Sequence, residues 1–110
     1  MVRSVRKTLV FKKEYGRSII LGKKTTTIRL SSNVKKGDIV DVRVGDVHVG
    51  RAIIESVTVK KVRELTDSDA RDDGFRSKED LLNELRKIYG KQRITDDTEV
   101  KLIKFRLLDL

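Results

Sequence analysis

Hydrophobic and polar residues change their spacing several times along the chain, and each change predicts a new element. Residues 5–11 read as a first strand. Residues 12–21 place apolar side chains near helical spacing, which predicts a short helix ending at Gly22. From residue 25 to residue 30 the spacing becomes two, so this segment is expected to be a second strand.

The middle of the chain predicts a β-hairpin. The sequence KKGD at 35–38 is typical of a turn, because its glycine can take a positive φ. Residues 39–44 then alternate valines with polar residues, as a half-buried strand does. Gly45 and Asp46 suit a tight turn into a long strand at 47–62, so 38–62 is expected to be a hairpin.

Helices are expected next. Thr66 can cap a short helix at 67–73, and Ser77 can open a second helix that ends at Gly90. The last strand is expected at 99–108. An apolar stripe on the second helix is formed by Leu81, Leu82, Leu85, Ile88 and Tyr89. The order β-α-β-β-β-α-α-β predicts an α+β fold built on a small, mostly antiparallel sheet or barrel.

Composition narrows the possible functions. A chain of 110 residues is expected to be a single domain, 1–110. It has no cysteine and one histidine, His48, which excludes disulfides, iron–sulfur clusters and His-rich metal sites. We expect His48 to be a surface residue. The longest apolar run is three residues, so we expect no membrane span and no signal peptide. A monomeric cytoplasmic protein without a cofactor is the expectation.

Charge is distributed unevenly along the chain. Residues 1–63 carry 16 Lys and Arg against 5 Asp and Glu, a net charge of +11, whereas residues 64–110 carry 10 against 12, a net charge of −2. A basic sheet region beside an acidic helical region would orient a polyanion toward one side of the molecule. An ordinary highly charged surface, of the kind common in thermophilic proteins, is the alternative explanation.

The sequence GKKTTTIR at 22–29 is the strongest local signal for a ligand site. Its lysines supply ammonium donors, and Thr27 and Arg29 would point from one strand face toward the same space. The alternative is a solvated edge strand whose threonines serve β-propensity alone.

Two carboxylates stand where a short helix is expected to end. Asp72 and Asp73 lie just before Gly74, and the helix dipole disfavours anions at that end. They therefore need a cationic partner, and the turn containing Lys23 and Lys24 is a candidate. No P-loop, dinucleotide fingerprint, zinc spacing or RNA-recognition aromatic motif is present.

Several motifs together resemble an ASCH domain, a relative of the PUA domains. They are GKKTTTIR, the KKGD turn before an apolar strand, and LTDSDARDDGF followed by SKEDLLNELRKIYG. The resemblance covers essentially the whole chain. It implies a small, mostly antiparallel β-barrel with flanking helices, and a cleft that accepts RNA or a nucleobase.

The resemblance also implies roles for particular residues. One branch of the family is a small amidohydrolase that removes the acetyl group from N4-acetylcytidine, and a ribonuclease activity belongs to another branch. The hydrolase positions fall on Lys24, Thr27 and Asp73, the last being a glutamate in the family. Lys24 and Thr27 have opposite strand parity, so they reach one cleft only if the strand starts at or after Thr25.

Two functions follow as the main hypotheses. The first is binding of RNA or a nucleotide, with contacts from Lys23, Lys24, Thr25, Thr27, Arg29, Lys35 and Lys36. The second is amide hydrolysis on a modified nucleoside, in which like charges and partial burial lower the pKa of Lys24 so that its neutral amine acts as a base. A nuclease and an adaptor domain without a ligand are the remaining alternatives.

Overall fold

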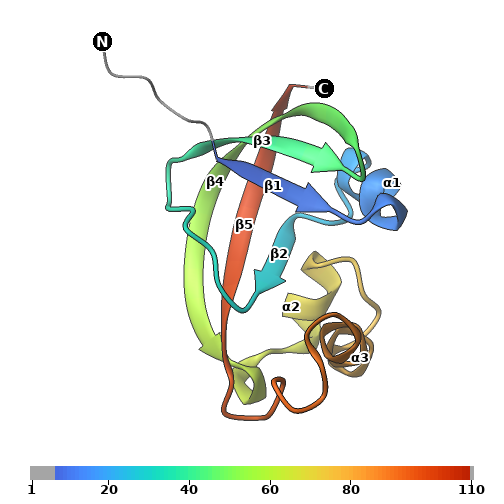
Figure 1. Ribbon diagram of the computed structural model, residues 1–110, viewed down its shortest axis with the longest axis vertical. Coiled ribbons are helices and arrows are strands. Elements are labelled where there is room, and N and C mark those ends of the chain that lie inside the picture. The colour runs from blue at the N-terminus through green and yellow to red at the C-terminus, as the bar shows by residue number, and fades with distance from the viewer. Residues whose placement is uncertain (1–6, 110) are drawn as a thin grey trace.

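The computed structural model describes residues 7–109, which form one curled five-stranded sheet with helices at its ends (Figure 1). In chain order the elements are β1 (Thr8–Phe11), the 3-10 helix η1 (Lys13–Tyr15), α1 (Gly16–Ile20), β2 (Thr26–Arg29), β3 (Ile39–Val44), β4 (Val47–Lys61), the 3-10 helix η2 (Val62–Glu64), α2 (Asp67–Asp72), α3 (Lys78–Tyr89) and β5 (Glu99–Asp109). This order confirms the predicted succession of strands and helices.

The strands are arranged in the order β1-β3-β4-β5-β2, so β1 and β2 are the two edges of the sheet. β1 pairs with β3 in parallel, and the other three pairings are antiparallel. The sheet curls into a half-barrel and brings its two edges toward each other (Figure 1). The predicted α+β fold with a small, mostly antiparallel barrel is therefore confirmed.

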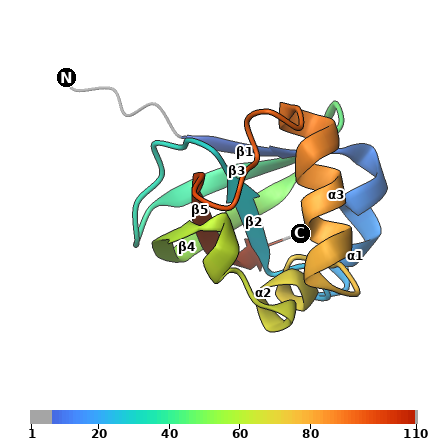
Figure 2. The same ribbon diagram turned by 90° about the horizontal axis from the view of Figure 1, so that it is seen from below.

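Two apolar clusters stabilise this arrangement. The first fills the inside of the curl and includes Leu9, Val40 and Phe105. The second lies between the sheet and the helices and includes Ile28, Leu81 and Val100. β5 contributes to both, because neighbouring residues of a strand face opposite sides. Figure 2 shows α2 and α3 beside β2, on the side where the second cluster lies.

Local sequence signals explain where the elements begin and end. Thr66 caps α2 by accepting a hydrogen bond from the Asp69 backbone amide, and Ser77 caps α3 in the same way. The predicted strand at 39–44 is β3, with the same limits. The predicted first strand began at Val5, which lies outside the described residues. No helix among the described residues is long and apolar enough to cross a bilayer.

Gly16 is the point where α1 packs against the sheet. A Cβ placed on this buried residue would lie 2.9 Å from Cγ1 of Val44, closer than two carbon atoms tolerate. The glycine, which lowers helix propensity, is therefore required by the close approach of α1 to β3.

We expect Gly16→Ala to destabilise the protein, by up to about 2.5 kcal/mol, because the steric cost of about 1–3 kcal/mol outweighs the helix-propensity gain of about 0.5–1 kcal/mol. Urea denaturation of the variant measures the difference. In a Val44→Ala background the clash is absent, so Gly16→Ala should become neutral or stabilising. Equal destabilisation in both backgrounds would contradict this account of Gly16.

Candidate functional site

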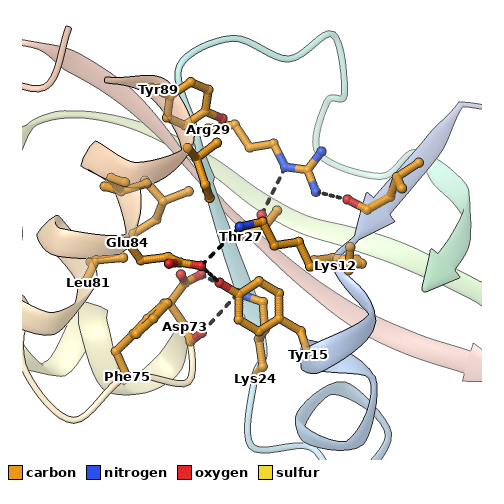
Figure 3. Close-up of a pocket in the computed structure, with 15 residues that line it drawn as sticks. Lys12, Tyr15, Lys24, Thr27, Arg29, Asp73, Phe75, Leu81, Glu84 and Tyr89 are labelled. Carbon is orange, nitrogen blue, oxygen red and sulfur yellow. Dashed lines mark hydrogen bonds and ion pairs between the residues drawn. The ribbon is translucent and has the colours of Figure 1, made fainter. Parts of the chain in front are cut away.

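A hollow of about 200 Å³ lies in the gap between the edge strands β1 and β2, with α3 along one side (Figure 3). We call it the edge pocket. Its walls are mostly apolar and include Phe11, Phe75 and Leu81. Its polar side chains are Lys12, Tyr15, Lys24, Thr27, Arg29, Asp73 and Glu84. The pocket thus joins residues from the N-terminal part of the chain to residues from the helices.

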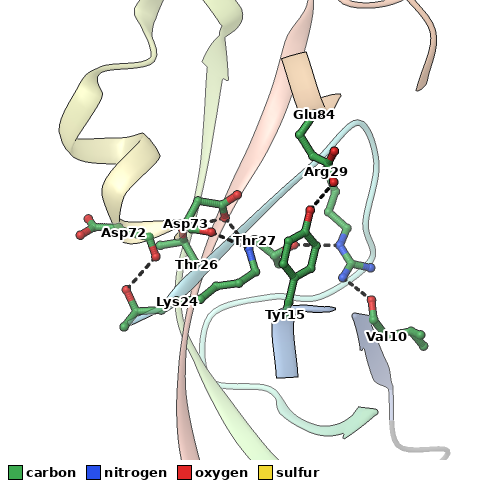
Figure 4. Close-up of polar contacts among 10 residues, drawn as sticks. Val10, Tyr15, Lys24, Thr26, Thr27, Arg29, Asp72, Asp73 and Glu84 are labelled. Atoms are coloured by element: carbon green, nitrogen blue, oxygen red, sulfur yellow. Dashed lines mark hydrogen bonds and ion pairs between the residues drawn. The ribbon is translucent and has the colours of Figure 1, made fainter. Parts of the chain in front are cut away.

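Lys24 and Asp73, which both line this pocket, form a buried ion pair (Figure 4). The Lys24 Nζ lies 3.0 Å from Asp73 Oδ1 and also donates to the Asp73 backbone carbonyl at 3.0 Å. The hydroxyl of Thr26 donates to the same Oδ1 at 3.0 Å. Lys24 and Asp73 are each only 4% exposed. The cationic partner predicted for the helix-end carboxylates is therefore Lys24, and it pairs with Asp73.

Backbone hydrogen bonds fix the segment that carries Lys24. The amides of Lys23 and Lys24 both donate to the carbonyl of Ser18 near the end of α1. The amide of Thr25 donates to the carbonyl of Asp72 at 2.8 Å, which ties the segment to the end of α2. β2 starts only at Thr26. The condition that lets Lys24 and Thr27 reach one cleft is thus met, and both line the edge pocket.

Burial shifts the pKa values of both partners away from their usual values. Burial lowers the pKa of Lys24, and the Asp73 carboxylate opposes this shift. Burial likewise raises the pKa of Asp73, against the attraction of Lys24. The direction predicted for Lys24 is confirmed, but its largest cause is burial, and the charge of Arg29 is a smaller cause. Lys23, the other cation invoked, is exposed.

Arg29 orients Thr27 and joins the two edges of the sheet. Its Nε donates to the Thr27 hydroxyl oxygen at 3.1 Å, and its Nη2 donates to the Val10 carbonyl at 2.7 Å (Figure 4). Val10 belongs to β1 and Arg29 to β2, so a side chain closes the gap that the backbone leaves open. Because the Thr27 oxygen accepts this bond, its own proton remains available for donation.

The pocket contains a second polar pair, Tyr15 and Glu84, which was not predicted from the sequence. The Tyr15 hydroxyl donates to Glu84 Oε2, and Lys12 Nζ lies 3.5 Å from the same oxygen (Figure 3). The hydrogen bond from Tyr15 lowers the pKa of Glu84, so its carboxylate is ionised near neutral pH. The pKa of Tyr15 is raised by burial and by this bond.

One signal for Glu84 was available in the sequence. It lies three residues after Leu81 and four before Ile88, so it shares their helix face rather than the charged face. A charged residue within an apolar stripe indicates that this part of the helix faces a polar group or a cavity instead of the apolar core. Tyr15, in contrast, carries no such signal, because it fits the helical spacing of apolar residues within 12–21.

The structure does not bring all the predicted residues to the edge pocket. Lys24, Thr27, Arg29 and Asp73 line it, whereas Thr25 lines a neighbouring hollow. Lys23, Lys35 and Lys36 are exposed and do not line the pocket. Their role as RNA contacts stays a prediction. His48 is exposed as expected, 3.3 Å from Asp41. Among residues 7–109, no group of His, Cys, Asp or Glu side chains has the arrangement of a metal site.

Comparison with known proteins identifies the fold. No protein-family model matches the chain, and no curated protein matches its sequence. Solved structures do match. A protein of the family DUF984 from Enterococcus faecalis superposes with a TM-score of 0.76 at 15% identity, covering 99% of this chain and 84% of its own.

Two ASCH proteins of known structure are also similar. An ASCH domain from Lactobacillus crispatus has a TM-score of 0.72 at 15% identity, covering 83% of this chain and 68% of its own. A variant of ZmASCH from Zymomonas mobilis has a TM-score of 0.62 at 19% identity, covering 96% and 77%. At sequence identities this low, the structural similarity establishes the fold and nothing further. The chain therefore has the fold of ASCH domain structures, as its sequence motifs indicated.

Proposed function

We propose that the chain binds RNA or a nucleotide, and that a nucleobase is the part of the ligand that enters the edge pocket. The observation that carries this proposal is the convergence of Lys24, Thr27, Arg29 and Glu84 in one small, mostly apolar hollow. Its volume of about 200 Å³ suits a single small ring system.

The pocket walls match the chemistry of a base. A nucleobase presents hydrogen-bond donors and acceptors on its edges and apolar faces above and below the ring. Lys24 and Arg29 supply donors, and the Glu84 carboxylate supplies acceptors. The rings of Phe11, Phe75 and Tyr89 supply surfaces on which a flat ring can pack.

Charge supports a nucleic-acid ligand beyond the pocket. The formal net charge is +9, and residues 1–63 alone carry +11. Such an excess attracts a phosphate backbone without regard to sequence, whereas contacts to the base inside the pocket supply selectivity. Binding of a single-stranded RNA would combine both contributions.

Hydrolysis of an N4-acetylcytidine-type amide is a second candidate function, and one observation favours it. The three residues that the ASCH resemblance implies for this reaction, Lys24, Thr27 and Asp73, line the same pocket. Asp73 is one methylene shorter than the glutamate of the family, yet its Oδ1 lies 3.0 Å from Lys24 Nζ. The shorter acid therefore still reaches the lysine.

In this reaction Lys24 acts as the base and Thr27 as the nucleophile. The neutral amine of Lys24 takes the proton of the Thr27 hydroxyl, and the threonine oxygen forms a bond to the acetyl carbon. The C–N bond then breaks, and the leaving nitrogen takes its proton from the Lys24 ammonium. A water molecule hydrolyses the acetyl-threonine and releases acetate. The bond from Arg29 Nε stabilises negative charge on the threonine oxygen, and Asp73 positions Lys24.

For binding, we expect Thr27→Val to weaken cytidine binding about 2- to 10-fold in isothermal titration calorimetry, because one hydrogen bond of about 0.5–1.5 kcal/mol is lost. Thr25→Val is the matched control: the same substitution two residues away, at a position that does not line the edge pocket. It should leave cytidine binding unchanged. Absence of cytidine binding by the unmodified protein, or equal losses in both variants, would contradict the proposed pocket.

For the charge state of Lys24, an NMR titration of its side chain should give a pKa below the usual lysine value of about 10.4. Asp73→Asn should lower this pKa further, because the carboxylate raises it by attraction and by hydrogen bonding. Glu84→Gln is the control, since Glu84 acts on Lys24 in the same direction but more weakly. A rise in the Asp73→Asn protein would refute the assigned causes.

For hydrolysis, Lys24→Arg should reduce turnover of N4-acetylcytidine by at least about 100-fold, because arginine keeps the cation beside Asp73 but does not act as a base at accessible pH. Chromatography of the released cytidine measures the rate. Lys23→Arg is the matched control and should remain active. In the unmodified protein the rate should rise with pH up to the lowered pKa of Lys24. Equal rates for both variants would remove Lys24 from the reaction.

A further inference from the structure

A second hollow, of about 350 Å³, lies on the other side of the segment that carries Lys24. We call it the flank pocket. It is bounded by α1, by the residues just before β2, and by the C-terminal half of β5. Pairing between β2 and β5 ends at Thr26 and Lys104, so the edge of β5 beyond this point is not covered by β2. In Figure 1 this region lies where β5 runs beside α1.

The flank pocket combines an apolar floor with a cationic rim. Ile20, which is 49% exposed, and the half-buried Leu107 contribute the accessible apolar surface, whereas Ile19 and Phe105, at 1% and 3%, are core residues behind it. Lys104 and Arg106 are two residues apart on β5, so both point to the side of the sheet opposite Phe105 and Leu107, and both are exposed at the margin of the pocket. Within residues 7–109, no hydrogen bond or ion pair neutralises Lys104.

Among the described residues that line the flank pocket, Glu55 is the only acidic one. Its Oε2 lies 3.7 Å from Arg106 Nε, and both side chains are largely exposed, at 39% and 62%. An ion pair this long and this exposed contributes little to stability, so Arg106 can exchange it for another anion. The rim therefore carries an excess of positive charge that the fold itself does not use.

The two pockets are adjacent because Lys24 lines both of them. A ligand chain that places one unit in the edge pocket can continue past the 22–25 segment into the flank pocket. The exposed ammonium of Lys23 stands on that segment, which adds positive charge between the two pockets.

We propose that the flank pocket is a subsite for the nucleotide next to the one whose base occupies the edge pocket. Its sugar rests on the apolar floor, and its phosphate binds Lys104 and Arg106. This inference rests on the proposed RNA or nucleotide binding, and it adds a second binding position and the residues that form it. A free nucleoside would not use this subsite, whereas a single-stranded RNA would.

The test compares cytidine with a short oligocytidylate by calorimetry over a range of salt concentrations. In the double variant Lys104→Ala/Arg106→Ala, affinity for the oligocytidylate should fall about 10-fold or more. The slope of log affinity against log salt should become shallower by about 0.7, since Lys104 and Arg106 hold one phosphate and each phosphate contact on a single strand contributes about 0.7. Cytidine binding should stay unchanged.

Lys91→Ala/Arg93→Ala is the matched control. It likewise removes one lysine and one arginine, but from exposed positions in the loop before β5, at the opposite end of that strand (Figure 1). It should leave the salt slope nearly unchanged. Equal effects of the two double variants would show nonspecific attraction only and overturn the flank pocket, as would oligocytidylate binding that neither variant alters.

The outcomes separate this inference from the proposed function. If the unmodified protein binds neither cytidine nor oligocytidylate, the proposed function fails and the subsite fails with it. If both bind and Lys104→Ala/Arg106→Ala has no effect, the subsite alone is wrong. In that case the two charges serve only to discourage another strand from pairing with the open edge of β5.

Discussion

The buried contact between Lys24 and Asp73 fixes the entry to β2 against the end of α2, and the edge pocket is built on this junction. The pair links the entry to β2 with the end of α2, two segments that lie 49 positions apart in the chain. Loss of one partner would leave a buried charge without compensation, at a cost of about 3–5 kcal/mol. The same low-polarity surroundings that make the pair costly also lower the pKa of the lysine. The energetic cost of breaking the pair and the lowered pKa of Lys24 therefore have a common origin.

The pair lies where the two apolar clusters meet. Phe11 belongs to the cluster inside the curled sheet, and Phe75 packs against the cluster under the helices. Both rings line the edge pocket beside the polar groups. The pocket is consequently held on both sides by well-packed core, which keeps its polar side chains in place without a ligand. Polar side chains that are already in place lose little conformational entropy when a ligand binds, which favours selective binding.

Local signals predicted most of the fold and the central part of the site. The alternation in 39–44 and the caps at Thr66 and Ser77 gave correct elements, because they depend on neighbouring residues. The need of Asp73 for a cation also followed from local physics, since a helix end disfavours an anion, and the turn with Lys23 and Lys24 was the candidate. The pair formed by Tyr15 and Glu84 was missed because it depends on how α3 docks against η1. The parallel pairing of β1 with β3 also depends on the closure of the whole sheet.

The hydrogen bond from Arg29 to the Val10 carbonyl has a consequence for the whole half-barrel. The two edges of the sheet are clasped by one flexible side chain instead of a ladder of backbone bonds, and the candidate pocket lies in that gap. A molecule seated there would complete the missing wall. Its affinity and the melting temperature of the domain would then rise and fall together, since whatever binds only the folded chain also stabilises it.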